Sequence, residues 1–217
     1  MYKSIIFDVD GTILNPEEGI ISSVNYTIEQ AGLMKLSEQE LKEFVGPPVQ
    51  NSFQKFYKVT EDKAQELANV FRLRYKNKDL LKAKPYDGIF ETLQNLKDKK
   101  FKLGVATYKR EDYAITLLNQ MRFNKYFEVI CGGDNENKLK KVDIIKLCVE
   151  KLNIPISECL MVGDSIHDFE GAQSLNMKFL GVTYGFGFKK QEKLDNSCIG
   201  LANNPAEIIN IIERIDK

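Results

Sequence analysis

Two aspartates stand two residues apart near the start of the chain, in the run Phe7-Asp8-Val9-Asp10-Gly11-Thr12. Two carboxylates directly after an apolar stretch are costly to hold close together unless a cation or a proton shares them. One such carboxylate can act as a nucleophile while the other transfers protons. Gly11 lets the backbone turn sharply and present amide groups to an anion. The pattern therefore favours a reactive acidic site over a simple acidic turn at the end of a strand.

A second pair of aspartates lies in the run Gly163-Asp164-Ser165-Ile166-His167-Asp168, after a later apolar segment. Taken alone, Asp164 and Asp168 are typical of a residue that caps a helix and an acid in its first turn. If both acidic pairs follow parallel strands, however, they meet at one edge of the sheet and can bind one hard cation. Mg²⁺ fits best because it takes few protein carboxylates, keeps several waters and works beside phosphate. His167 either titrates near that metal or faces solvent in a loop.

Phosphoryl transfer also requires cations and hydrogen-bond donors around the non-bridging oxygens. Thr107 offers a hydroxyl at the end of a predicted strand, with the amide of Tyr108 beside it. Lys141 opens a predicted helix and can reach the same cleft, with Lys140 as its direct rival. A solvated lysine is the simpler interpretation of either residue, so spacing alone leaves this choice open.

Short apolar runs alternate with amphipathic helical patterns over most of the chain. The runs predict strands that are buried on both faces, at residues 5–9, 103–107, 127–131, 160–163 and 179–182. Helical patterns lie at residues 88–99, 110–121, 141–152, 167–176 and 204–215. This alternation predicts an α/β fold with a Rossmann-like, doubly wound parallel sheet.

Residues 15–83 break the alternation, because this stretch carries only helical patterns. Helix starts are indicated by Ser37-x-x-Glu40 and by Thr60, and turn-rich junctions flank the stretch. We therefore expect a core domain made of residues 1–14 and 84–217, with a small all-helical cap domain of residues 15–83 inserted after the first strand. Open α/β sheets bind ligands at the carboxyl ends of their strands, so the cap is placed to act as a lid.

Composition and charge indicate which kinds of binding partner to expect. The 217 residues are 43% hydrophobic, and Lys+Arg and Asp+Glu both number 31. A chain without net charge is not drawn to nucleic acid or to anionic membranes, and its amino-terminal apolar run is too short for a signal peptide or a membrane span. Four widely spaced cysteines and one histidine make no zinc-site spacing, which favours a reduced, cytoplasmic setting. The expected partner is a small-molecule phosphate ester, and the expected state is a monomer or a homodimer.

Asp8 to Thr12, Thr107, Lys141 and Gly163-Asp164-x-x-x-Asp168 together resemble the four motifs of the haloacid dehalogenase superfamily, in order and spacing across the whole chain. The helical insertion is similar to the small helical cap of that group. Two segments, 44–48 and 181–187, resemble its phosphoglycolate phosphatase-like subgroup. Tyr108-Lys109-Arg110 departs from the Ser-Lys-Pro that many relatives carry after the threonine position.

The resemblance implies a Mg²⁺-dependent phosphatase that hydrolyses a small phosphate monoester through an aspartyl-phosphate. Asp8 would attack phosphorus, and Asp10 would protonate the leaving alcohol and then activate water. Alignment of the run from Lys141 to Ile145 favours Lys141 over Lys140. The phosphoryl group would be held by Asp8, Gly11, Thr107, Tyr108 and Lys141.

The resemblance also implies a metal site and a specificity site. Asp8, the backbone carbonyl of Asp10 and Asp164 would ligate Mg²⁺, and Asp168 would orient Lys141 or a metal-bound water. In the cap, Gly46, Pro47 and Pro48 would border the leaving group.

Other functions stay open at this point. A phosphosugar mutase of the β-phosphoglucomutase type shares the core residues, and a catalytically inactive or receiver-like signalling domain is a more distant alternative. Dehalogenases of the superfamily lack the second carboxylate, so Asp10 argues against dehalogenation. The substrate remains open between phosphoglycolate, a nucleotide, a sugar phosphate and pyrophosphate.

Overall fold

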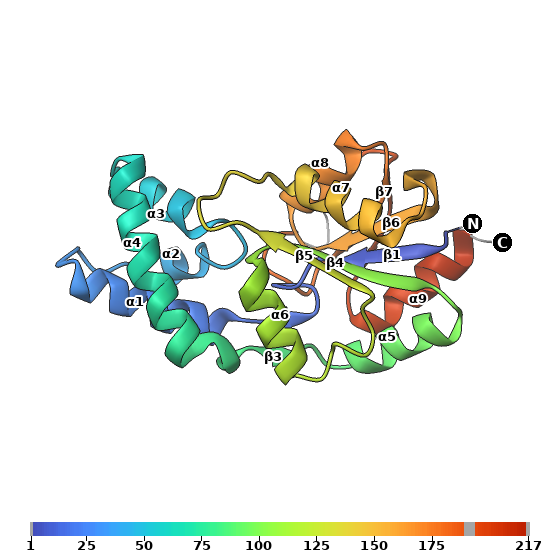
Figure 1. Cartoon of the computed structure of the whole chain (residues 1–217), viewed down its shortest axis with the longest axis horizontal. Helices are drawn as coiled ribbons and strands as arrows, with labels where there is room; N and C mark the ends of the chain where they lie inside the picture. Colours follow the sequence, from blue (N-terminus) through green and yellow to red (C-terminus); the bar gives the residue numbers. More distant parts are fainter. Residues whose placement is uncertain (1, 189–193, 216–217) are drawn as a thin grey trace.

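The structure is a computed structural model that describes residues 2–188 and 194–215, and it confirms the α/β, doubly wound fold (Figure 1). Six strands form one sheet in the order β5-β4-β1-β6-β7-β8, and every neighbouring pair is parallel. The strands are β1 (Ser4–Phe7), β4 (Lys102–Arg110), β5 (Val129–Gly133), β6 (Cys159–Gly163), β7 (Lys178–Val182) and β8 (Cys198–Ala202). The chain builds outward from β1 in one direction and then in the other, so the strand order reverses at β1. Ligands of such sheets bind at this reversal, beside the carboxyl ends of the strands.

The sixth strand is absent from the sequence prediction. Strand β8 pairs with β7 at the edge of the sheet. Four of its five residues are only partly buried, and it contains Gly200. A short, half-exposed edge strand produces no continuous apolar run, so the pattern that identified the other five strands does not detect it.

Helices cover both faces of the sheet (Figure 1). One face carries α5 (Ile89–Asp98), α6 (Glu111–Gln120) and α9 (Pro205–Ile215). The other carries α7 (Lys141–Leu152) and α8 (Ile166–Ser174), and the 3₁₀ turn η3 (Ile156–Glu158) precedes β6. In β1, Ile5 and Phe7 pack on the first side and Ile6 on the second, since successive strand residues point to opposite faces. Burial on both sides fixes the register of β1 and with it the position of the residue that follows.

Between Asn15, which belongs to β2, and Ala83, the regular structure is helical; residues 15–83 are called the cap segment. It contains α1 (Glu17–Gln30), α2 (Glu38–Lys42), α3 (Val49–Tyr57), α4 (Glu61–Arg74), the π-helical turn η1 (Tyr75–Asp79) and the 3₁₀ turn η2 (Leu80–Lys82). Ser37 and Glu40 form the expected capping box at α2, and the Thr60 hydroxyl accepts from the backbone N–H of Lys63 at the start of α4. The helix starts indicated by the sequence are therefore confirmed.

The two crossings between the core and the cap segment lie side by side. Strand β2 (Leu14–Asn15) pairs antiparallel with β3 (Lys84–Pro85), with Leu14 opposite Pro85. The sequence analysis treats both places as turn-rich junctions and does not predict their pairing. The cap segment consequently leaves and re-enters the core through one short ribbon.

A buried carboxylate fixes the end of the cap segment. Asp79, which closes η1, accepts a hydrogen bond from the Ser23 hydroxyl at 2.9 Å and from Arg74 Nε at 3.0 Å. Lys82 Nζ lies 2.9 Å from its other oxygen. A buried carboxylate is tolerated only with such partners, so this cluster holds η1 against α1.

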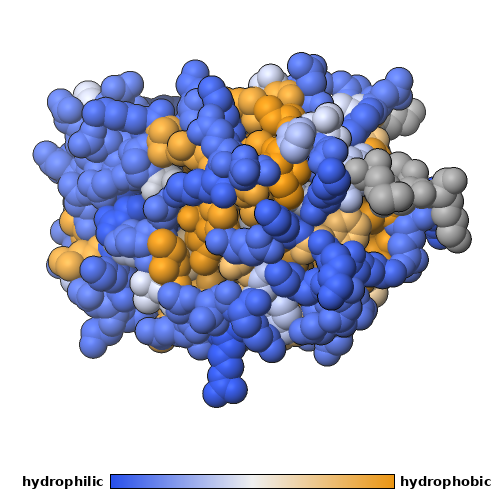
Figure 2. All heavy atoms as spheres, turned by 45° about the vertical axis from the view of Figure 1, so that its right-hand side comes forward, coloured by the Kyte–Doolittle hydropathy of each residue, from blue (hydrophilic) through white to orange (hydrophobic). Residues whose placement is uncertain are grey.

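The amino end of the sheet has a mixed apolar and charged surface. Figure 2, turned by 45° so that the side with both termini in Figure 1 comes forward, shows apolar residues at the surface in patches between charged ones. A cavity of about 780 Å³ lies at this end, between residues that precede β1 and β4 and residues of α5 and α9. Glu213 is the one carboxylate among its described lining residues, so acidic chemistry must be sought at the opposite end. No helix in the described part of the chain combines the length and apolar character needed to span a membrane.

Candidate active site

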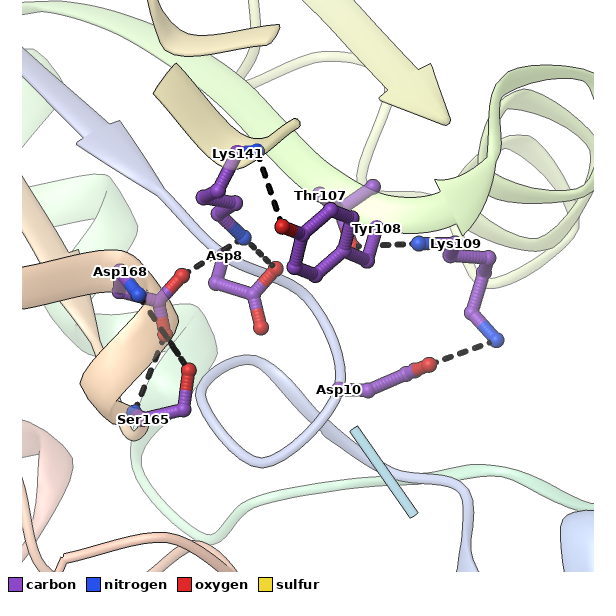
Figure 3. A network of polar contacts seen from close by, with 8 residues as sticks. All are labelled: Asp8, Asp10, Thr107, Tyr108, Lys109, Lys141, Ser165 and Asp168. Carbon is purple, nitrogen blue, oxygen red and sulfur yellow. Dashed lines mark hydrogen bonds and ion pairs between the residues drawn. The ribbon is translucent and has the colours of Figure 1, made fainter. Parts of the chain in front are cut away.

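Asp8 directly follows β1, at the point where the strand order reverses. Its backbone N–H donates to the carbonyl of Val162 at 2.9 Å, which continues the pairing of β1 with β6. Lys141 Nζ lies 2.7 Å from Asp8 Oδ1 and 2.6 Å from Asp168 Oδ1 (Figure 3). All three side chains are buried. One ammonium group therefore partly neutralises two carboxylates, one at the end of β1 and one in the first turn of α8.

The structure separates Lys141 from its rival. Lys141 is the first residue of α7, and its backbone N–H donates to the hydroxyl of Tyr108 at 3.0 Å. Lys140 is exposed, and its backbone N–H is capped by the Asp143 carboxylate at 2.9 Å. Adjacent residues at a helix start point in directions that differ by about 100°, so only Lys141 enters the acidic cluster.

Asp164 follows β6 and is held by backbone amides. Its Oδ2 accepts from Phe186 N–H at 2.7 Å and from Gly187 N–H at 3.2 Å. Gly11 has φ +87° and packs so closely that a Cβ there would lie 2.1 Å from Asp164 Oδ2; one at Gly185 would lie 2.4 Å away. Glycine at these two positions lets the first acidic loop and the 184–187 segment close around Asp164.

The acidic residues fit a hard divalent cation. Asp8, Asp164 and Asp168 each offer an oxygen within 4.8 Å of the others. Burial raises the pKa of Asp8 to about 6 although Lys141 opposes this, and burial with the neighbouring Asp168 and Asp8 charges raises the pKa of Asp164 to about 8. The pKa values rise because the nearby positive charge of Lys141 does not balance the buried negative charges of the carboxylates. An all-oxygen set with that deficit suits Mg²⁺.

Asp168 is bound more completely than the other two carboxylates. Besides the contact to Lys141, its Oδ2 accepts from Ser165 N–H at 3.0 Å and from the Ser165 hydroxyl at 2.7 Å. Ser165 is thus the residue that caps α8, and Asp168 is the acid in its first turn. The interpretation of Asp164 as the helix cap is therefore wrong, because Ser165 is the N-cap, whereas Asp168 is the expected acid of the first turn.

The second aspartate of the first pair has its own lysine. Lys109 Nζ lies 2.9 Å from Asp10 Oδ2, and the lysine side chain is only 4% exposed (Figure 3). Burial disfavours the charged lysine, but Asp10 and the hydroxyl of Tyr75 outweigh this and raise its pKa. No role is predicted for Lys109 from the sequence. The spacing could have indicated one, because residues two apart in a strand share a face and Lys109 stands two residues after Thr107.

Thr107 and Tyr108 lie at the carboxyl end of β4. The Thr107 hydroxyl is buried and accepts from the backbone N–H of Lys109 at 3.2 Å. Tyr108, which the sequence predicts to contribute its amide, also places its side chain in the site, because its hydroxyl accepts from the backbone N–H of Lys141. The ring of His167 packs edge-on against that of Tyr108, with 5.6 Å between ring centroids. His167 is half-buried in the first turn of α8 and is not a loop residue.

Residues of the cap segment line cavities together with the acidic residues of the core. Gly46 and Pro47 line an inner cavity of about 80 Å³ together with Asp10, Lys109 and Tyr75. They also line a wider cavity of about 680 Å³ with Asp164 and His167. Pro48 stands directly before α3 as its N-cap. Of the three residues expected to border the leaving group, Gly46 and Pro47 therefore lie beside the carboxylates, whereas Pro48 lines neither cavity.

Comparison with known proteins gives the family. The model described as haloacid dehalogenase-like hydrolase matches residues 5–182. The chain belongs to this family. The resemblance seen in the sequence is thereby confirmed, and the chain is an enzyme of the phosphatase type.

The chain is similar to several phosphatases over most of its length. It is 33% identical to a 5'-nucleotidase of Pseudomonas aeruginosa over 86% of this chain and 85% of that protein. It is 31% identical to a phosphoglycolate phosphatase of Agrobacterium fabrum, over 83% and 80%. A crystal structure from Clostridium acetobutylicum, described as a predicted phosphatase, superposes with a TM-score of 0.91 at 35% identity and covers 99% of both chains.

Proposed function

We propose that this phosphatase hydrolyses a small phosphate monoester with Mg²⁺, through an aspartyl-phosphate formed on Asp8. The observation that carries the proposal is the buried contact of Lys141 with Asp8 at 2.7 Å, with Asp10 two residues away on an enclosed cavity. A nucleophile, a fixed cation and a proton-transferring group are the parts that this reaction requires.

In the first half-reaction, Asp8 attacks phosphorus. Lys141 engages Oδ1, which leaves Oδ2 as the attacking oxygen. The new bond from Asp8 to phosphorus forms as the bond to the leaving oxygen breaks, and Asp10 gives that oxygen a proton. The Thr107 hydroxyl and the backbone amide of Tyr108 hold the phosphoryl oxygens. The backbone N–H of Gly11 donates to the carbonyl of Leu14 at 2.8 Å, so Gly11 serves the site through its turn and not as a phosphate donor.

In the second half-reaction, a water attacks the phosphorus of the aspartyl-phosphate. Asp10, now a carboxylate, accepts the proton of that water. The bond between phosphorus and Asp8 breaks, its electron pair returns to the Asp8 carboxylate, and inorganic phosphate leaves. The same two side chains are then ready for the next ester.

The metal would be held by Asp8, Asp164 and the backbone carbonyl of Asp10, with Asp168 in support. When bound, Mg²⁺ neutralises negative charge on the phosphoryl group and orients it. Lys141 alone leaves the three-carboxylate cluster with net negative charge, which supports the presence of such a cation.

Two cavities adjoin the site on either side of Gly46 and Pro47. The inner one, of about 80 Å³, lies beside Asp10 and has room for the part of the leaving group next to the scissile bond. The wider one, of about 680 Å³, lies beside Asp164 and His167. Aromatic residues and the cations Arg72, Lys109 and Arg110 line the inner cavity, which suits a short polar or anionic alcohol such as a hydroxy acid.

A panel of phosphate esters with Mg²⁺, scored by release of inorganic phosphate, tests the proposal. The panel includes phosphoglycolate, a nucleoside monophosphate, a sugar phosphate and pyrophosphate, and a hexose 1-phosphate mutase assay runs beside it. Asp8→Asn should lose at least about 10⁴-fold in kcat, as expected for removal of a nucleophile, and acid-quenched wild type should carry one phosphoryl group on Asp8 by mass spectrometry. Asp62→Asn, at an exposed cap residue, is the matched control. Retained turnover in Asp8→Asn would sink the mechanism.

A further inference from the structure

Lys109 links the core to the cap segment at the acid–base residue. Its Nζ contacts Asp10 Oδ2 from β4 and also donates to the hydroxyl of Tyr75 at 2.9 Å. The same ammonium lies 4.8 Å from the centroid of the Tyr75 ring. Tyr75 begins η1 in the cap segment. The lysine is therefore held from one side by the core and from the other side by the cap.

Tyr75 is itself fixed in position. Its ring stacks on Phe71 of α4 with 5.4 Å between centroids and meets Tyr113 of α6 at 6.3 Å. Asp79 ties the far end of the same π-helical turn to α1 through Ser23. Because Tyr75 is buried and packed on both layers, its hydroxyl is a fixed acceptor for Lys109.

The two oxygens of Asp10 are in different situations. Oδ2 is engaged by Lys109, whereas Oδ1 is buried and has no hydrogen-bond partner among the described residues. Asp10 and Lys109 both line the inner cavity. Rotation of the carboxylate would break a buried ion pair, which is costly in a low-dielectric site. The contact thus holds Oδ2 in place and leaves Oδ1 as the oxygen of Asp10 that is available for proton transfer.

We propose that Lys109, braced by Tyr75 across the cap interface, is a positioning residue that orients Asp10 to deprotonate the water that hydrolyses the aspartyl-phosphate. In this step the water proton goes to Asp10 Oδ1 while the bond between phosphorus and Asp8 breaks. Fast hydrolysis leaves little time for a substrate to turn around and be rephosphorylated, so the arrangement favours a phosphatase over a mutase. The inference rests on the proposed aspartyl-phosphate mechanism.

The test separates the two half-reactions by pre-steady-state kinetics on p-nitrophenyl phosphate with Mg²⁺. This ester has a good leaving group, so phosphorylation of Asp8 needs little help from Asp10, whereas hydrolysis still does. In Lys109→Met we expect the hydrolysis rate constant to fall about 10²-fold, the low end for general-base catalysis, and the phosphorylation rate constant to change less than about threefold. Acid-quenched samples should then accumulate the phosphoryl adduct on Asp8.

Tyr75→Phe removes only the acceptor hydroxyl and is a milder second variant. Its hydrolysis rate constant should fall about threefold to tenfold, again with phosphorylation little changed, as expected for a group that acts through another. The controls are Lys63→Met, at an exposed lysine paired with Glu66, and Tyr57→Phe, whose hydroxyl donates to Met34 within the cap. Thermal unfolding confirms that each variant is folded.

The outcomes distinguish the two proposals. Absence of any Asp8 adduct and of Asp8-dependent turnover in wild type would overturn both. An adduct that forms in wild type and is hydrolysed equally fast in Lys109→Met and Tyr75→Phe would overturn the positioning role alone. Equal losses in both half-reactions would also overturn it, because they indicate general damage to the site. If Lys109→Met does not fold, the hydrolysis rate of Tyr75→Phe decides.

Discussion

The two sides of the active site are built differently. The phosphoryl side consists of Asp8, Lys141, Asp164 and Asp168, all from the core and all at the ends or starts of core elements. The leaving-group side combines Asp10 and Lys109 with Tyr75, Gly46 and Pro47 of the cap segment. A buried lysine occurs on each side, but only Lys109 depends on the cap for its second partner. In the proposed mechanism, the core therefore carries out the chemistry at phosphorus, and the interface between core and cap segment handles the alcohol and the water.

The largest effect is expected from the phosphoryl side. Lys141→Met should lower kcat about 10³-fold, the range for loss of one preorganised electrostatic group, and equally for an alkyl and an activated aryl ester. The loss is independent of the leaving group because the missing cation acts on the phosphoryl oxygens and on Asp8. Steady-state kinetics on the two esters measure it, with Lys146→Met, an exposed lysine of the same helix, as the control. A loss of kcat that differed strongly between the alkyl and the aryl ester would contradict the separation of the active site into a phosphoryl side and a leaving-group side.

A smaller and selective effect is expected from the leaving-group side. In the first turnover, Asp10→Asn should slow release of an alkyl alcohol about 10²-fold, as for loss of a general acid. Release of p-nitrophenolate should slow much less, because that group leaves without a proton. Rapid-quench measurements of the two alcohols give the ratio. Equal losses would contradict the acid role of Asp10.

The smallest effect concerns stability. The pKa of Asp164 is raised from 3.8 to about 8, mainly by burial. Between these pH values the folded protein keeps a proton that the unfolded chain has released, so this contribution to stability is complete below about pH 4 and is lost as the pH rises through about 8. Asp164→Asn removes the buried charge, and the metal-free variant should unfold about 2–4 °C above wild type at pH 8 for each kcal/mol gained.

Mg²⁺, bound to the folded state as proposed, should have the opposite effect on the two proteins' relative Tm values. It should raise the Tm of wild type, more at pH 8 than at pH 6, where protons compete for the carboxylates. It should leave the Tm of Asp164→Asn almost unchanged. Thermal unfolding at both pH values, with and without Mg²⁺ and with Asp62→Asn as control, tests this. An equal rise of Tm in the variant would show that Asp164 does not hold the ion.

Much of the fold could be predicted because burial leaves a pattern in the sequence. Strands such as β1 and β6 are buried on both faces and appear as continuous apolar runs. Strand β8 is half-exposed, and β2 and β3 have two residues each. Such elements are defined by their partners and not by their own composition.

The site could be predicted in part for a related reason. Asp8, Asp10 and Asp164 stand at strand ends, where the sheet itself brings them together. The choice between Lys140 and Lys141 depended on a side-chain direction that spacing does not give. The contact of Lys109 with Tyr75 joins residues 34 apart through the packing of the cap segment on the core. No local pattern records a contact that exists only after two layers have docked.

The ribbon of β2 and β3 has a consequence for how such an enzyme diversifies. Both ends of the cap segment meet in two facing residue pairs, Leu14 with Pro85 and Asn15 with Lys84. A segment inserted between those pairs begins and ends at the same two-stranded ribbon. The strands of the core sheet stay paired beside it. We expect that a whole lid can be exchanged there, by recombination or by design, without disturbing Asp8. A new alcohol specificity then arises beside unchanged phosphoryl-side residues, provided that the incoming segment supplies a partner for Lys109 in place of Tyr75.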